Sequence, residues 1–281
     1  MRHSIVLSKI AKNHCHFFVE RTTMETPAVG TPNKFELGEL LLEIGALLMV
    51  SGANTERIKI TIDRIASAFD CFTNLMITNH ALTISLTQQD TNKVFTSVKW
   101  VPNMHLNFNL IADISTMSWK IVLEKWSVER INQELTSLNR KQLYPRWLVL
   151  ALVALAGASF CRLFGGNVTE MIAVFVASFC GLFVRQEAIK LKFNFYLAIF
   201  FAAATASLIA GSYFYFHPDE EYKHAFSTSV LFLIPGVPMI HACSDLLDGN
   251  TLNGITRAVN VMLMAFAIAC GLLISLLIYK F

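Results

Sequence analysis

AVNVMLMAFAIACGLLISLLIY, residues 258–279, contains no Asp, Glu, Lys or Arg. A helix rises about 1.5 Å per residue, so this run is long enough to cross a hydrocarbon core of about 30 Å. The sequence therefore predicts a transmembrane helix over 254–279, which begins four residues earlier and includes Arg257. This prediction decides the fold class, because a run of this kind is difficult to place in a water-soluble domain.

Similar apolar runs fill the rest of the C-terminal half. The chain is 54% hydrophobic and 15% charged, with a mean hydropathy of +0.50, whereas soluble domains carry about a quarter charged residues. We predict a transmembrane α bundle over 146–281, with five spans at 146–164, 168–185, 193–214, 225–245 and 254–279. The first two runs are short, so they span only if Arg162, Glu170 and Arg185 lie at the interfaces; a re-entrant hairpin is the alternative.

The N-terminal half has a different composition, because charged residues recur every few positions up to Arg146. Residues 1–33 are predicted to be a flexible leader, and 34–145 a small α+β domain. Leu82, Ile84 and Leu86 alternate with polar residues, which is typical of a half-buried strand. Its expected neighbours are strands at 94–101 and 71–78. Helices are expected at 35–50, from 54 onwards, at 110–126 and from 127 onwards.

The distribution of basic residues predicts the orientation in the membrane. Residues 1–33 have no long apolar core, so they do not resemble a secretory signal, and the N-terminal domain is expected to stay in the cytoplasm. Basic residues also favour alternate connections between the spans, as the positive-inside rule requires. The residues concerned are Arg140, Lys141 and Arg146, then Arg185, Lys190 and Lys192, and finally Arg257.

A double-proline segment, Pro235-Gly236-Val237-Pro238, interrupts the fourth predicted span. Each proline lacks a backbone donor, which removes the usual helical partners of the Leu231 and Ile234 carbonyls. Such a break survives in a membrane only inside protein or beside water, and secondary transporters use broken helices to bind substrates and ions. The sequence leaves two interpretations open, a transport pathway and a simple proline kink.

Ionisable residues follow this break. His241 and Asp245 lie one turn apart and therefore share a helix face, and ionisable groups within membrane segments are candidates for function. Asn260, early in the fifth span, could hydrogen-bond to Asp245. The alternative is that Asp245 and Asp248 lie at the cytoplasmic interface, paired with Arg257. Secondary candidates are Glu170 and Arg185, which could be interfacial anchors or ligands of a substrate or proton.

Several classes of function have no support in the sequence. There is no Walker A sequence, GxSxG elbow, HExxH motif or dinucleotide fingerprint, so we predict neither an enzyme nor a cofactor. The histidines and six cysteines show no metal-ligand spacing, and no metal is expected. A net charge of +3 without a basic stripe argues against nucleic acid.

Three segments resemble the threonine/serine exporter family. They are Ser51-Gly52-Ala53-Asn54-Thr55-Glu56-Arg57, Phe164-Gly165-Gly166, and Ile234 to Pro238 continuing through Asp245-Leu246-Leu247-Asp248-Gly249-Asn250. The resemblance covers the chain from about Phe35 to its end. It implies a bacterial inner-membrane, multi-pass exporter of small polar metabolites, and the larger subunit of a split exporter of the succinate-export type.

The resemblance also implies partners and site residues. It maps functional segments onto Pro235, Gly236, Val237 and Asp245, and onto Ser51, Gly52, Ala53, Thr55 and Arg57. His241 departs from the Asn expected at its position. The implied partners are the lipid bilayer, a small membrane subunit that completes the transporter, and a small carboxylate or amino-acid substrate; a homo-oligomer is also possible.

Two hypotheses therefore stand. The first is one subunit of a gradient-driven exporter of threonine, serine or succinate, with a pathway at Pro235, Gly236, Val237, Pro238, His241, Asp245 and Asn260. The second is a membrane-anchored regulatory or interaction module without transport activity, in which the N-terminal domain is the working part.

Overall fold

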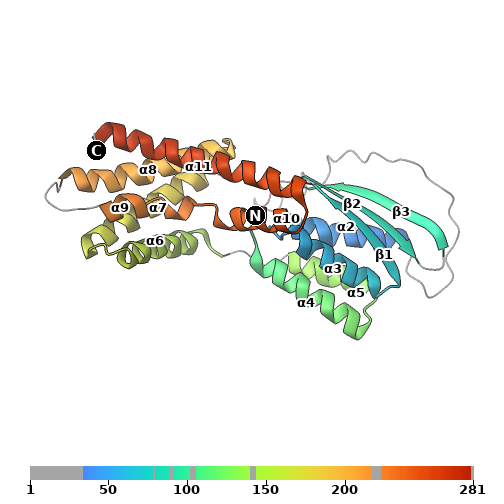
Figure 1. The fold of residues 1–281 in the computed structure, drawn as a ribbon. Helices are drawn as coiled ribbons and strands as arrows, with labels where there is room; N and C mark the ends of the chain where they lie inside the picture. The colour runs from blue at the N-terminus through green and yellow to red at the C-terminus, as the bar shows by residue number, and fades with distance from the viewer. Residues whose placement is uncertain are drawn as a thin grey trace. The chain divides into compact units, whose positions relative to one another are not determined.

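The computed structural model describes residues 34–78, 80–88, 91–101, 106–139, 144–216 and 223–279. These residues belong to a single compact unit that begins at Lys34. The leader predicted at 1–33 lies outside the described residues. Figure 1 shows a sheet with helices in the first half of this unit, and helices alone in the second half.

The first half contains a three-stranded antiparallel sheet and four helices, the first two of which pack on the sheet (Figure 1). Its elements are α2 (Lys34–Val50), α3 (Thr55–Ser67), β1 (Cys71–Ile77), β2 (Ala81–Gln88), β3 (Thr91–Trp100), α4 (Phe108–Glu124) and α5 (Val128–Asn139). The sheet order is β1-β2-β3, with Leu75 opposite Ile84 and Ile84 opposite Ser97. All three predicted strands are confirmed, including the one at 71–78.

Alternation along β2 determines which face of the sheet is buried. Leu82, Ile84 and Leu86 are at most 1% exposed, because they face α2 and the core. Burying each such side chain contributes about 1.5–3 kcal/mol to folding. α2 and α3 pack on this face of the sheet, and α4 and α5 pack against α2. This arrangement places the start of α3 close to the start of α4.

The second half contains the apolar helices. These are α6 (Arg146–Leu163), α7 (Val168–Lys190), α8 (Phe195–Phe216), the short α9 (Lys223–Thr228), α10 (Gly236–Leu247) and α11 (Thr251–Tyr279). In the described part of the chain, four helices (α6, α7, α8 and α11) are each long and apolar enough to cross a membrane. A fifth crossing would require α9 and α10, which are bent by 62° at the proline segment, to form one broken span.

Large apolar side chains on these helices point outward. Leu155, Ile172, Met262, Phe266 and Leu277 are all more than half exposed. A soluble monomer rarely exposes so much apolar surface, whereas a lipid environment requires it. Length, composition and surface therefore agree that this is a membrane protein.

Small residues bring α8 and α11 into close contact. Ala202, Ala203 and Ala206 are fully buried. Ser207 on α8 hydrogen-bonds Ser275 on α11, with 2.6 Å between their hydroxyl oxygens. A side-chain carbon added at Gly271 would lie 2.7 Å from the Cβ of Ala203 and 2.8 Å from the Phe200 carbonyl oxygen. Glycine is therefore required there by close backbone approach.

Replacing Gly271 with Ala should lower the free energy of unfolding by about 1–3 kcal/mol, because the new methyl group meets rigid backbone atoms. Denaturant unfolding of the purified protein in detergent measures this change. Gly236→Ala is the matched control, since no atom lies within 4 Å of the position its methyl group would take. Equal stability of the two variants would contradict the close α8–α11 contact.

Candidate functional site

The proline segment separates a 3₁₀ turn at Leu231–Leu233 from α10. Two carbonyls that lose their helical partners accept other hydrogen bonds: Leu231 O from Ile234 N at 3.1 Å, and Ile234 O from Gly236 N at 2.9 Å. The break therefore leaves fewer free carbonyl lone pairs than the sequence suggested. Each carbonyl still has a second lone pair for an ion or a polar ligand.

The residues of the break are half-buried, and there is open space beside them. Pro235, Gly236, Val237 and Pro238 all have intermediate exposure. Gly236 is the first residue of α10, and a side-chain carbon added to it would meet nothing within 4 Å. Its backbone is not left-handed, so neither conformation nor packing requires glycine at this position.

Asp245 is completely buried on α10 and faces a cation on the next helix. The Nη1 atom of Arg257, on α11, lies 2.9 Å from the Oδ2 atom of Asp245. The alignment of this ion pair is poor for hydrogen bonding, and neither carboxylate oxygen of Asp245 has a hydrogen bond within the described residues. A buried carboxylate usually needs such bonds in addition to its counter-ion, so Asp245 is left under-solvated.

The two other candidates near Asp245 have partners of their own. Asp248 is exposed at the end of α10, and its Oδ2 atom accepts a hydrogen bond from the Ser244 hydroxyl at 3.1 Å. The Oδ1 atom of Asn260 accepts a hydrogen bond from the Tyr196 hydroxyl at 3.1 Å. The partner seen for Asn260 is thus Tyr196 on α8, and the partner seen for Asp245 is Arg257.

Glu170 and Arg185, both on α7, differ in how well they are satisfied. Glu170 is 2% exposed and accepts hydrogen bonds from the backbone N–H groups of Asn167 at 2.8 Å and Ala225 at 3.3 Å. It therefore ties the start of α7 to the start of α9. Arg185 lies inside α7, over the ring of Phe195, and its buried Nε atom has no hydrogen-bond partner in the described part of the chain.

The segment Ser51–Arg57 forms the corner between α2 and α3. Gly52 has a φ of 86°, which favours glycine at this turn. The Ser51 carbonyl accepts a hydrogen bond from Asn107 N at 3.0 Å, which ties the corner to the start of α4. Asn54 caps α3 by accepting from the backbone N–H of Arg57 at 3.1 Å. Ala53 and Thr55 are buried, so most of this motif holds the corner in place.

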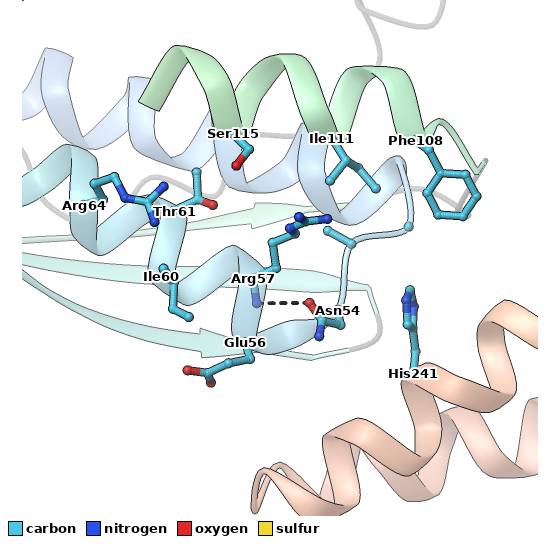
Figure 2. Close-up of a pocket in the computed structure, with 12 residues that line it drawn as sticks. Asn54, Glu56, Arg57, Ile60, Thr61, Arg64, Phe108, Ile111, Ser115 and His241 are labelled. Atoms are coloured by element: carbon cyan, nitrogen blue, oxygen red, sulfur yellow. Dashed lines mark hydrogen bonds between the residues drawn. The ribbon is translucent and has the colours of Figure 1, made fainter. Parts of the chain in front are cut away.

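A pocket of about 410 Å³ lies between this corner, α4 and α10 (Figure 2). Residues of α3 and α4 line most of it, and His241 of α10 lines the side facing the break. In Figure 2 the Arg57 side chain reaches toward Ile111 of α4, and the Glu56 side chain points the other way. Sequence patterns single out Arg57 and His241 separately. They do not associate these two with Arg64, which follows Arg57 by two turns but belongs to no motif, or with Phe108, Ile111 and Ser115, which are distant in sequence.

Two hydrogen bonds hold α3 and β1 against the corner between α10 and α11. The Nζ atom of Lys59 donates to the Oδ1 atom of Asn250 at 2.7 Å. The Nδ2 atom of Asn253 donates to the Ile77 carbonyl oxygen at 2.8 Å. The broken helix is thus connected directly to the sheet-containing half of the protein.

The chain is similar to known transport proteins. A family model described as "Putative threonine/serine exporter" matches residues 39–279. A curated relative from Escherichia coli (strain K12), "Probable succinate transporter subunit YjjP", is 25% identical over 249 residues, which cover 85% of this chain and 93% of the relative. Its namesake from Klebsiella aerogenes is 26% identical over 200 residues, covering 69% and 75%. No solved structure matches the chain. Because the family model matches most of its length, the chain belongs to the threonine/serine exporter family.

Proposed function

We propose that this protein is one subunit of a gradient-driven exporter of a small carboxylate or amino acid, with succinate and threonine or serine as the candidate solutes. The observation that carries the proposal is the buried pair of Asp245 and Arg257, which follows directly on a broken apolar helix. An ionisable pair buried among apolar helices is a candidate for coupling solute movement to a proton gradient.

The candidate solutes come from the relatives. The family is described as a threonine/serine exporter family, and both curated relatives are named as succinate transporter subunits. All these solutes carry a carboxylate, which the N-terminus of α10 at Gly236 would attract through the helix dipole. Arg185 would add a full positive charge. The names of the relatives also support a second, small membrane subunit as the partner of this chain.

Within this proposal the candidate residues have different roles. Asp245 carries the proton, and Arg257 provides the positive charge that compensates the Asp245 carboxylate. His241, one turn before Asp245 on α10, lines the pocket. Pro235, Gly236, Val237 and Pro238 form the wall of the pathway. Glu170 and Asn260 connect helices through the hydrogen bonds described above, whereas the hydrogen bond to Asp248 lies within the end of α10. The basic connections support a cytoplasmic N-terminal half.

The energy source can be tested with cells preloaded with labelled succinate. Because the sequence contains no nucleotide-binding motif, we expect a protonophore to abolish the efflux that depends on this protein. Depleting ATP while an imposed pH gradient is maintained should leave the efflux unchanged. Efflux that stops when ATP is depleted, although the pH gradient is maintained, would contradict a secondary exporter.

A regulatory module is the second candidate, and the pocket against α10 is the observation that favours it. Deleting residues 1–140 distinguishes the two, provided that the truncated chain still inserts into the membrane. Export that persists would make the deleted half accessory. A lost regulatory output without any change in solute flux would favour the module.

A further inference from the structure

We propose that the pocket between the Ser51–Arg57 corner, α4 and α10 binds a small dicarboxylate, with Arg57 as its principal contact. This inference rests on the proposed function in one respect, since a dicarboxylate is also a candidate solute. It adds a second site, lined mostly by α3 and α4, and names the chemistry that the site recognises.

Arg57 is the first reason to expect an anion. Its guanidinium has no hydrogen bond or ion pair to any residue within the described ranges, although it lines the pocket. Other arginines do have partners: Arg130 pairs with Glu124 at 3.3 Å, and Arg146 with Glu187 at 2.5 Å. Arg57 is exposed, and Glu56, the acidic residue next to it, also lines the pocket, although its side chain points away from that of Arg57 in Figure 2. An anion entering the pocket would find an available cation with five donors.

Two helix N-termini add positive potential at the same place. α3 begins at Thr55 and α4 at Phe108, and the Asn107–Ser51 hydrogen bond holds these two starts together. The first turn of each helix presents backbone N–H groups and the positive end of the helix dipole. The resulting field favours a carboxylate, and it acts together with the charge of Arg57.

A second arginine favours two carboxylates over one. Arg64 lies two turns after Arg57 on the same face of α3, about 10 Å further along the helix, and it also lines the pocket. One of its Nη atoms donates to the Ser118 hydroxyl at 2.9 Å, and its guanidinium stacks on Trp119. Its guanidinium is therefore held in place, and its other N–H donors remain available to a ligand. Thr61 and Ser115 line the pocket as well and offer hydroxyl groups to the ligand.

The position of the pocket connects its occupant to the broken helix. His241 forms the wall on the α10 side, one turn before Asp245 (Figure 2). The Lys59–Asn250 and Asn253–Ile77 hydrogen bonds keep α10 and α11 against α3 and β1. A bound dicarboxylate would therefore contact both halves of the protein.

The test is equilibrium binding of succinate to the purified full chain in detergent, with butyrate as the four-carbon monocarboxylate for comparison. We expect succinate to bind more tightly than butyrate. Arg57→Gln should weaken succinate binding about tenfold to a hundredfold, because it removes charge-assisted hydrogen bonds. Arg57→Lys should lose less, since it keeps the charge. Arg130→Gln, the same change on α5 away from the pocket, should bind like the wild type.

Two results would overturn the site: wild-type affinity in a folded Arg57→Gln variant, or butyrate binding as tightly as succinate. Melting temperatures equal to that of Arg130→Gln show that the variant is folded. Asp245→Asn should lose export and keep succinate binding, so a failure of the exporter proposal is distinguishable from a failure of the site. If Arg57→Gln raises the succinate concentration for half-maximal export, the bound molecule is cargo. If it changes only the maximal rate, the molecule is a regulator, and both outcomes uphold the site.

Discussion

Export by the Asp245→Asn variant should fall about tenfold or more, an effect equivalent to about 1.4 kcal/mol on a rate barrier. Asn has nearly the shape of Asp but cannot take up a proton, and Asp245 is the completely buried carboxylate beside the broken helix. The measurement is the initial rate of labelled solute efflux at equal amounts of protein in the membrane. The rate of wild-type efflux should change with pH. The remaining efflux of the variant should stay constant over the same pH range.

A second variant separates transport from stability. Asp245→Asn leaves the charge of Arg257 buried without its partner, which costs about 3–5 kcal/mol in typical cases. The double variant Asp245→Asn, Arg257→Gln removes both charges and should regain much of that stability. We expect it to remain inactive. A double variant that recovers both stability and export would show that the pair only holds α10 against α11.

Gly236→Leu should reduce export several-fold while leaving the melting temperature unchanged. Leu is a good helix former, the backbone at Gly236 is not left-handed, and nothing lies within 4 Å of its added side-chain carbon. The side chain therefore enters open space beside the break instead of disturbing the packing. If that space is the route of the solute, a larger side chain obstructs it. Efflux and thermal unfolding of the same preparation measure the two effects.

Gly236→Ala is the control for size. A single methyl group fills little of the space, so this variant should export more than Gly236→Leu and be as stable. Full export by Gly236→Leu would place the solute pathway elsewhere, and the proline segment would then be a simple kink.

Much of the fold follows from periodicity and apolar length. Leu82, Ile84 and Leu86 alternate with polar residues, and this pattern alone predicts a strand with one buried face. Long runs without charge predict helices in the same way. Pro235 and Pro238 indicate a break because each lacks a donor, but the 62° bend depends on how α9 and α10 pack. Local pattern does not contain that information.

Side-chain partners were harder to predict than elements. The sequence suggested that Asn260 could bond Asp245, with Arg257 as the alternative partner; in the structure Asn260 bonds Tyr196, and Arg257 is the residue that pairs with Asp245. The pocket was missed as well. Arg57, Ile111 and His241 come from three helices that are far apart in sequence, and only tertiary packing brings them together.

Efflux of labelled succinate and labelled threonine from preloaded cells tests the central claim most directly. The cells would express this chain alone, the proposed small membrane partner alone, or both. We expect efflux of one of the two solutes only when both proteins are present, because the relatives are named as subunits and the described residues contain four or five candidate spans. If neither solute leaves the cells, with both proteins shown to be in the membrane, the result would contradict a succinate or threonine exporter.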